Sequence, residues 1–168
     1  MKIYLATDHA GFALKEKVKL FLGQQGYDVE DCGAYQFDKD DDYPDFIAKA
    51  ALEVSKNPQN VQGIIFGSSG QGEAMVANKF KNIRCAVFYA PAVPVHNIDV
   101  TGKTSEDPFE TVRLTRAHNN ANMLSIGAKM LREEDAIKAI SLWLGASFTS
   151  EERHVRRVEK IKEIEQHG

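Results

Sequence analysis

The sequence contains no long apolar run and no excess of charge. No segment approaches the roughly 20 apolar residues of a membrane-spanning helix. The start at Met1 has no charged segment followed by an apolar stretch, so we expect no signal peptide. The 168 residues carry a net charge of −3, which favours neither nucleic acid nor an anionic membrane as a partner. The sequence therefore predicts a protein of the cytoplasm.

Cysteine is also scarce, and the acidic residues form no metal motif. Cys32 and Cys85 are the two cysteines; they have no CxxC or metal-ligand spacing, and each lies in a strand-like run. We interpret both as small buried residues with reduced thiols. The acidic run 40–42 has no second ligand group at a suitable spacing, so a solvated loop is favoured over a metal site.

The remaining features are typical of one globular domain spanning residues 1–168. Hydrophobic residues make up 43% of the chain and charged residues 27%. Short apolar runs that predict strands alternate with periodic segments that predict helices. The predicted strands are 2–8, 27–33, 61–67, 84–90 and 122–128. The predicted helices are 11–26, 46–56, 73–80, 108–120, 133–146 and 150–168.

This alternation predicts an α/β fold: a Rossmann-like, doubly wound five-stranded parallel sheet with an extra C-terminal helix. In such sheets a ligand binds beyond the carboxyl ends of the strands, where the strand order reverses. With the common five-strand order, strands one and three flank this position. The first ends at Asp8 and His9, and the third ends at a glycine-rich loop. We therefore expect these two polar clusters to face each other across one crevice.

The glycine-rich loop lies in the segment FGSSGQGEAMVANKF, residues 66–80, which has three glycines within six residues. It lacks the lysine that ends the Walker A pattern, and a methionine stands where the dinucleotide fingerprint needs a small residue. A tight turn that needs positive φ would explain the glycines. It would not explain why Ser68, Ser69, Gln71 and Glu73 crowd the same loop.

Glu73 lies at the start of the predicted helix, where its carboxylate would repel a bound phosphate. The positive end of a helix stabilises a carboxylate, and equally a transient oxyanion. Removal of a proton from a carbon next to a carbonyl requires a base beside hydrogen-bond donors, because the donors hold the enediolate that forms. We therefore interpret Glu73 as a candidate general base.

Other polar residues allow both a structural and a functional interpretation. Asp8 is suited to capping a helix, although its place at the switch point favours a functional role. His118 ends a predicted helix, where a histidine is favoured by the dipole alone. Arg153 and Arg157 lie four residues apart on one helical face. They form either a solvated basic surface or a pair that binds a phosphate.

Six motifs in the same order along the chain resemble the ribose-5-phosphate isomerase B family, which also includes the subunits of galactose-6-phosphate isomerase. The motifs are ATDHAGF, DCGA, DDDYPDF, GSSGQGEAMVANK, HNN and RHVRRVEKI. The resemblance covers nearly the whole chain. It implies an aldose–ketose isomerase with a Rossmann-like fold that uses no metal and no other cofactor. It also implies a homodimer or a dimer of dimers.

The resemblance implies roles for individual residues. Part of the family uses a cysteine in the glycine loop as the base, and that position is Gly67 here. Another part uses a glutamate just after the loop, which matches Glu73, with Ser69 adjoining it. His118 matches the histidine that opens the sugar ring. The resemblance implies that His118 and Asn119 reach the site from the other subunit. The residues that match substrate contacts are Asp8, His9, Tyr43, Ser68, Gly70, Gly72, Asn119, Lys129, Arg153 and Arg157.

Two features depart from the family pattern. Lys129 stands where the family often has an arginine, which keeps the positive charge but loses the bidentate geometry. The connection 89–107 is longer than usual, and it could form a lid or a surface excursion. The leading prediction is isomerisation of ribose 5-phosphate to ribulose 5-phosphate. The alternatives are isomerisation of a six-carbon sugar phosphate of the allose 6-phosphate or galactose 6-phosphate type, and binding of a sugar phosphate without catalysis, which the presence of Glu73 disfavours.

A dimer agrees with the pattern of the last predicted helix. Val158, Ile161 and Ile164 form an apolar stripe at three-residue spacing among basic residues. Such a stripe must lie on another surface, which is either the rest of the chain or a second subunit.

Overall fold

The computed structural model describes residues 1–167 and contains a five-stranded sheet in which every strand pair is parallel. The strands are β1 (Lys2–Thr7), β2 (Asp28–Asp31), β3 (Val61–Gly67), β4 (Cys85–Phe88) and β5 (Met123–Gly127). The helices are α1 (Phe12–Gln24), α2 (Tyr43–Lys56), α3 (Gln71–Ala77), α4 (Glu110–Asn119), α5 (Glu133–Gly145) and α6 (Glu152–His167). The predicted α/β class is confirmed.

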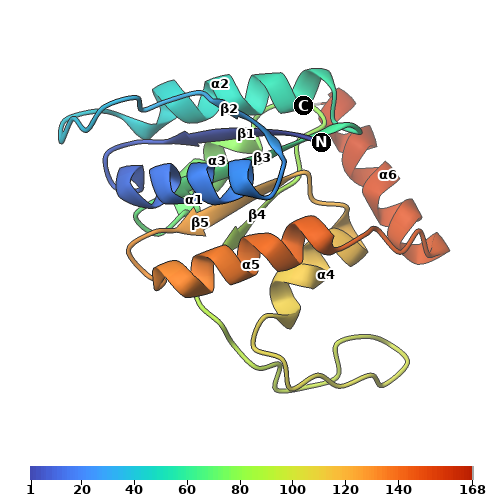
Figure 1. Cartoon of the computed structure of the whole chain (residues 1–168). Helices are drawn as coiled ribbons and strands as arrows, with labels where there is room; N and C mark the ends of the chain where they lie inside the picture. The colour runs from blue at the N-terminus through green and yellow to red at the C-terminus, as the bar shows by residue number, and fades with distance from the viewer. Residues whose placement is uncertain (168) are drawn as a thin grey trace.

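Helices cover both faces of the sheet (Figure 1). One face packs against α1, α4 and α5, where Val18, Leu22 and Trp143 are fully buried. The other face packs against α2 and α3 through small and branched side chains such as Ile47 and Ala77. Burial on both faces explains why β1, β3 and β5 consist of nearly continuous apolar runs.

The strand order is β2-β1-β3-β5-β4. β1 and β3 are neighbours, as expected, but β5 rather than β4 follows β3. Burial explains this arrangement. Every residue of β5 is buried, as an interior strand requires, whereas Cys85, Ala86 and Val87 of the edge strand β4 are only partly buried.

Element boundaries differ from the predicted ones in a few places. α2 begins at Tyr43 rather than at residue 46, so Pro44 lies in its first turn. Proline is tolerated there because the first turn needs no N–H from that residue. Cys32 is buried one residue beyond β2, and burial raises the pKa of its thiol to about 11. Cys85 is half-buried at the start of β4. The predicted end of the last helix, residue 168, lies outside the described residues.

The two ends of the sheet carry different elements. Since α4 leads into β5, its C-terminal end lies at the amino ends of the strands, and α6 packs beside it. The loops after β1 and β3 lie at the opposite, carboxyl edge (Figure 1). Within residues 1–167, no helix combines the length and apolar character needed to span a membrane.

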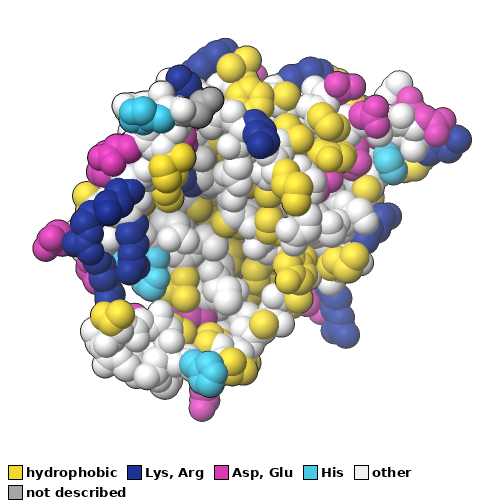
Figure 2. Space-filling model, turned by 180° about the vertical axis from the view of Figure 1, so that it is seen from behind, with side chains coloured by type: hydrophobic (Ala, Val, Ile, Leu, Met, Phe, Trp, Pro, Cys, Tyr) yellow, Lys and Arg dark blue, Asp and Glu magenta, His cyan; other side chains and the backbone are white. Residues whose placement is uncertain are grey.

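The apolar stripe of α6 is only partly covered. Val158 is 5% exposed and packs on the chain itself, whereas Ile161 and Ile164 are 41% and 71% exposed. Both isoleucines line a cavity of about 570 Å³ beside β4. Figure 2 shows hydrophobic side chains spread across the face over α3 and β4, with Lys and Arg gathered on the flank over α6.

Candidate active site

The carboxyl ends of β1 and β3 are held in direct contact. The hydroxyl of Thr7 donates to the carbonyl oxygen of Phe66 across the two strands at 2.9 Å. Gly11 packs so closely against both residues that a methyl group there would overlap them. This contact brings Asp8, the next residue after β1, close to the glycine loop that follows β3, as the sequence predicted.

Glu73 lies in the first turn of α3 and is only 5% exposed. Its carboxylate packs against the α-carbon of Gly67, so that a Cβ at residue 67 would occupy the same space. The Glu73 carboxylate therefore occupies the space into which a side chain at residue 67 would project. Burial raises the pKa of Glu73, and the charge of Asp8 raises it further. This pKa moves toward neutrality, which suits a general base.

The glycine loop is fixed by its neighbours. Gly70 adopts φ of +80°, which favours glycine, and its carbonyl oxygen accepts a hydrogen bond from the hydroxyl of Ser125 at 2.7 Å. A Cβ at Gly72 would lie 2.8 Å from the hydroxyl oxygen of Tyr43, so that tyrosine packs directly on the loop. Ser68 is exposed and Ser69 half-exposed at the same edge. The loop thus presents backbone and hydroxyl groups beside a buried carboxylate.

A histidine–carboxylate pair lies at the end of β1. Asp41 accepts two hydrogen bonds with one oxygen, from the backbone N–H of His9 at 2.9 Å and from its Nδ1 at 2.7 Å. The other Asp41 oxygen is buried without a partner among the described residues. Asp8 is held differently, because it accepts the backbone N–H of Ala10 at 2.9 Å.

Asp41 was missed by the sequence reasoning, which treated the run 40–42 as a solvated loop. Its hydrogen bond raises the pKa of His9, and the charges of Asp8 and Asp41 act in the same direction. The ligand atoms of these three side chains lie within 4.8 Å of one another. Asp41 holds His9 in place through its two hydrogen bonds, whereas Asp8 binds the backbone of Ala10. The spacing along the chain gave no signal of the contact between Asp41 and His9.

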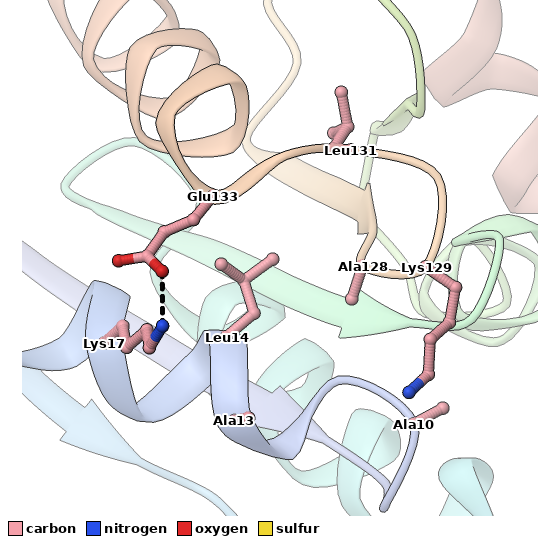
Figure 3. A pocket seen from close by; sticks show the side chains of 8 residues that line it. All are labelled: Ala10, Ala13, Leu14, Lys17, Ala128, Lys129, Leu131 and Glu133. Atoms are coloured by element: carbon pink, nitrogen blue, oxygen red, sulfur yellow. Dashed lines mark hydrogen bonds and ion pairs between the residues drawn. The ribbon is translucent and has the colours of Figure 1, made fainter.

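Lys129 follows β5 at the same edge. Its backbone N–H donates to the carbonyl oxygen of Ser68 at 3.0 Å, which fixes it beside the glycine loop. Figure 3 shows its side chain extending toward Ala10 in the turn before α1, at a pocket of about 200 Å³. The ion pair between Lys17 and Glu133 bounds this pocket on the other side. Lys129 thus contributes a positive charge beside Ala10 at the carboxyl edge of the sheet.

The remaining predicted residues form a second cluster. His118, Arg153 and Arg157 line a pocket of about 170 Å³. The ring centroids of His118 and His154 lie 4.2 Å apart, and the ring planes are tilted by 35°. Burial lowers the pKa of His118, and the nearby His154 and Arg153 add to this effect. A neutral imidazole can accept or donate a proton near pH 7.

The two clusters lie at opposite ends of the chain's own sheet. Glu73 is at the carboxyl edge, whereas His118 ends α4 at the amino edge. Asn119 lies with His118 at that edge, and its carbonyl oxygen accepts Nε of Arg84 at 3.1 Å. One copy of the chain therefore brings together Glu73, the glycine loop, His9, Tyr43 and Lys129. The cluster of His118, Arg153 and Arg157 lies at the other edge of the sheet.

Comparison with known proteins identifies the family of this chain. The family model described as Ribose/Galactose Isomerase matches residues 3–94 and 104–161. The chain belongs to the ribose/galactose isomerase family.

Members of this family include similar curated proteins. Ribose-5-phosphate isomerase B of Mycolicibacterium paratuberculosis is 35% identical over 98% of this chain and 92% of the relative. The Escherichia coli ribose-5-phosphate isomerase B is 32% identical over 98% of this chain and 97% of its own length. These matches extend over both clusters, so family membership does not depend on the glycine loop alone.

Solved structures of the family superpose on this chain. Ribose-5-phosphate isomerase B of Mycoplasma genitalium, solved with bound ribulose-5-phosphate, is 32% identical with a TM-score of 0.86, covering 99% of this chain and 97% of that chain. The Clostridium thermocellum enzyme is 34% identical with a TM-score of 0.83, covering 99% of both chains. The isomerase-family fold therefore extends over the whole described chain.

Proposed function

We propose that this protein is an aldose–ketose isomerase that interconverts ribose 5-phosphate and ribulose 5-phosphate. The observation that carries the proposal is the buried carboxylate of Glu73, held against Gly67 beside the glycine loop. The naming of its relatives as ribose-5-phosphate isomerase B, one of them with bound ribulose-5-phosphate, supports this substrate. The same names favour a five-carbon substrate over the six-carbon sugar phosphate that the sequence left open.

The reaction is a proton transfer between two adjacent carbons. Glu73 removes the proton from C2 of the open-chain aldose, and the electron pair moves toward the C1 carbonyl oxygen to form an enediolate. The protonated Glu73 then delivers a proton to C1 as the carbonyl forms at C2, and the proton of the C2 hydroxyl passes to the C1 oxygen. Backbone N–H groups of residues 68–72, with Ser69 beside them, stabilise the negative oxygen.

Other residues hold the substrate. Asp8, His9 and Tyr43 surround the sugar at the end of β1, and Asp41 is a positioning residue that keeps His9 charged and oriented. Lys129 adds positive charge at the same edge. Arg153 and Arg157 bind the phosphate, and Asn119 contacts the sugar. His118 opens the furanose ring by proton transfer. Its lowered pKa supports proton transfer by a neutral imidazole near pH 7.

These roles require two copies of the chain, because Glu73 and His118 lie at opposite edges of one sheet. We propose a symmetric homodimer, alone or within a dimer of dimers, in which each active site takes Glu73 from one subunit and His118 from the other. The exposed Met75, Ile161 and Ile164 supply apolar surface for such an interface. A single domain spanning residues 1–168 and a cytoplasmic location remain predictions.

Isotope exchange tests the reaction. The protein is incubated with ribose 5-phosphate in deuterated water, and the sugar is analysed by NMR. An enediolate reaction places deuterium at C2 of the aldose, whereas a binding module leaves the sugar unchanged. Allose 6-phosphate and galactose 6-phosphate, assayed in parallel, identify the preferred chain length.

Subunit mixing tests the shared site. Glu73→Gln and His118→Asn proteins are each prepared as homodimers, then mixed and allowed to exchange. With random exchange half of the dimers are mixed and half of their sites are intact, so activity should rise to roughly a quarter of the wild-type value. If both residues served the same site within one chain, every site would keep one defect. Absence of recovery, with exchange confirmed by mass-tagged subunits, therefore rejects the shared site.

A further inference from the structure

The segment 95–103 is absent from the family match, which stops at residue 94 and resumes at residue 104. It forms a compact turn rather than an open excursion. The backbone N–H of Ile98 donates to the carbonyl oxygen of Lys103 at 2.8 Å. Oδ1 of Asp99 accepts hydrogen bonds from the backbone N–H groups of Thr101 at 2.8 Å and Lys103 at 3.3 Å. We refer to residues 95–103 as the insertion.

The insertion reaches the second cluster at the amino edge of the sheet. It belongs to the long excursion between β4 and α4 at the bottom of Figure 1. Residues 97–100 form one wall of the pocket of about 170 Å³, and His118, Arg153 and Arg157 form the other. The insertion and the two arginines therefore enclose the same space.

Arg153 has a buried hydrogen-bond donor that could bind an anion in this pocket. Its side chain is 21% exposed, and its Nη2 lies 2.8 Å from a carboxylate oxygen of Glu151. Its Nε is buried without a hydrogen-bond partner among the described residues. A buried donor of this kind is costly unless an acceptor enters the pocket. An anion that binds Arg153 in this pocket would share it with Asp99, which also lines it.

We propose that Asp99 is a specificity-determining residue whose carboxylate competes with the substrate phosphate for the arginine pair. The inference rests on the proposed function, in which Arg153 and Arg157 bind the phosphate. A phosphate that enters the pocket brings negative charge close to Asp99, so binding must overcome this repulsion or displace the turn. The insertion thus weakens phosphate binding relative to a family member without it.

The charges around the pocket support this competition. Its positive groups are Arg153 and Arg157, and its negative groups are Asp99 and the Glu151 carboxylate on Arg153. The hydrogen bond from the Thr101 side chain is the main cause that lowers the pKa of Asp99, and the charge of Arg153 adds to it. Asp99 is therefore ionised at every pH at which a phosphate ester is a dianion.

The test is the variant Asp99→Asn, which keeps the Oδ1 acceptor of the turn and removes the charge. Glu106→Gln is the matched control, because it removes the same charge from an exposed residue of the same connection outside the pocket. Inorganic phosphate is the probe, measured by calorimetric titration of the full-length protein. Removing one charge near an exposed ion pair changes affinity by about two- to fivefold. We expect Asp99→Asn to bind phosphate more tightly than the wild type by that factor. The KM for the sugar phosphate should fall by the same factor, with kcat nearly unchanged.

The outcomes separate the inference from the proposed function. Unchanged or weaker phosphate binding in Asp99→Asn, while Arg157→Ala abolishes binding, overturns the role of Asp99 and leaves the phosphate site intact. An equal gain in Glu106→Gln also overturns it, because the effect would then be one of net charge. If Arg153→Ala and Arg157→Ala both bind phosphate as the wild type does, the phosphate site itself is misplaced.

Discussion

Replacing Glu73 by glutamine should remove catalysis and leave the fold intact. Glutamine has the same size and a similar helix propensity, but it cannot accept the proton from C2. Loss of a general base costs about 10²–10⁴-fold in rate, which corresponds to about 3–5 kcal/mol of transition-state stabilisation. We therefore expect kcat to fall by that factor with sugar-phosphate binding retained.

The same substitution should stabilise the fold near neutral pH. The Glu73 side chain is 5% exposed, and burial raises its pKa above the value of 4.5 for a free carboxyl. Below that value the carboxyl is protonated in both the folded and unfolded states. As pH rises through the folded-state pKa, the wild type must keep a buried charge and loses stability relative to the variant. The stability difference should grow with pH and then level off.

Coupled measurements check this prediction. Initial rates with ribose 5-phosphate give kcat, and thermal unfolding between pH 4 and pH 8 (about the working range of general acid–base groups) gives the stability difference. Glu134→Gln, at an exposed carboxyl in the first turn of α5, is the control that should change neither. Near-wild-type turnover in Glu73→Gln places the base elsewhere. A loss of activity that accompanies a loss of stability attributes the defect to unfolding, and the reasoning about burial is then wrong.

Two further substitutions test how the site is held. Gly67→Ala should displace the Glu73 carboxylate and lower kcat by about 10²-fold. The control Gly23→Ala adds a methyl group in open space and should leave kcat unchanged. Equal effects of the two substitutions on kcat would contradict the close packing at residue 67. Asp41→Asn should lower the pKa of His9, so that the fall of kcat/KM with rising pH begins at a lower pH than in the wild type. The exposed Asp40→Asn should leave the pH profile unchanged. An unshifted profile for Asp41→Asn means that the charged histidine is not required.

The sequence determined the fold class because its pattern is local. Mostly apolar runs of five to seven residues in β3 and β5 predict strands buried on both faces, and the helices between them require parallel pairing. The glycine loop followed by Glu73 was equally readable, since residue types at adjacent positions set its chemistry. Position in the sheet and the order of β4 and β5 depend instead on how much of each strand is buried, which a short run does not reveal.

Tertiary structure alone decided which distant residues meet. Asp41 reaches His9 because the loop before α2 folds over the end of β1, and no spacing along the chain encodes a contact across 32 positions. The overlap of Glu73 with the space beside Gly67 likewise depends on the turn into α3. The separation of Glu73 from His118 follows from parallel topology, which places the end of α4 at the edge opposite the glycine loop. Sequence supplies the reactive groups, and the packing of the elements sets the distances over which their charges and hydrogen bonds act.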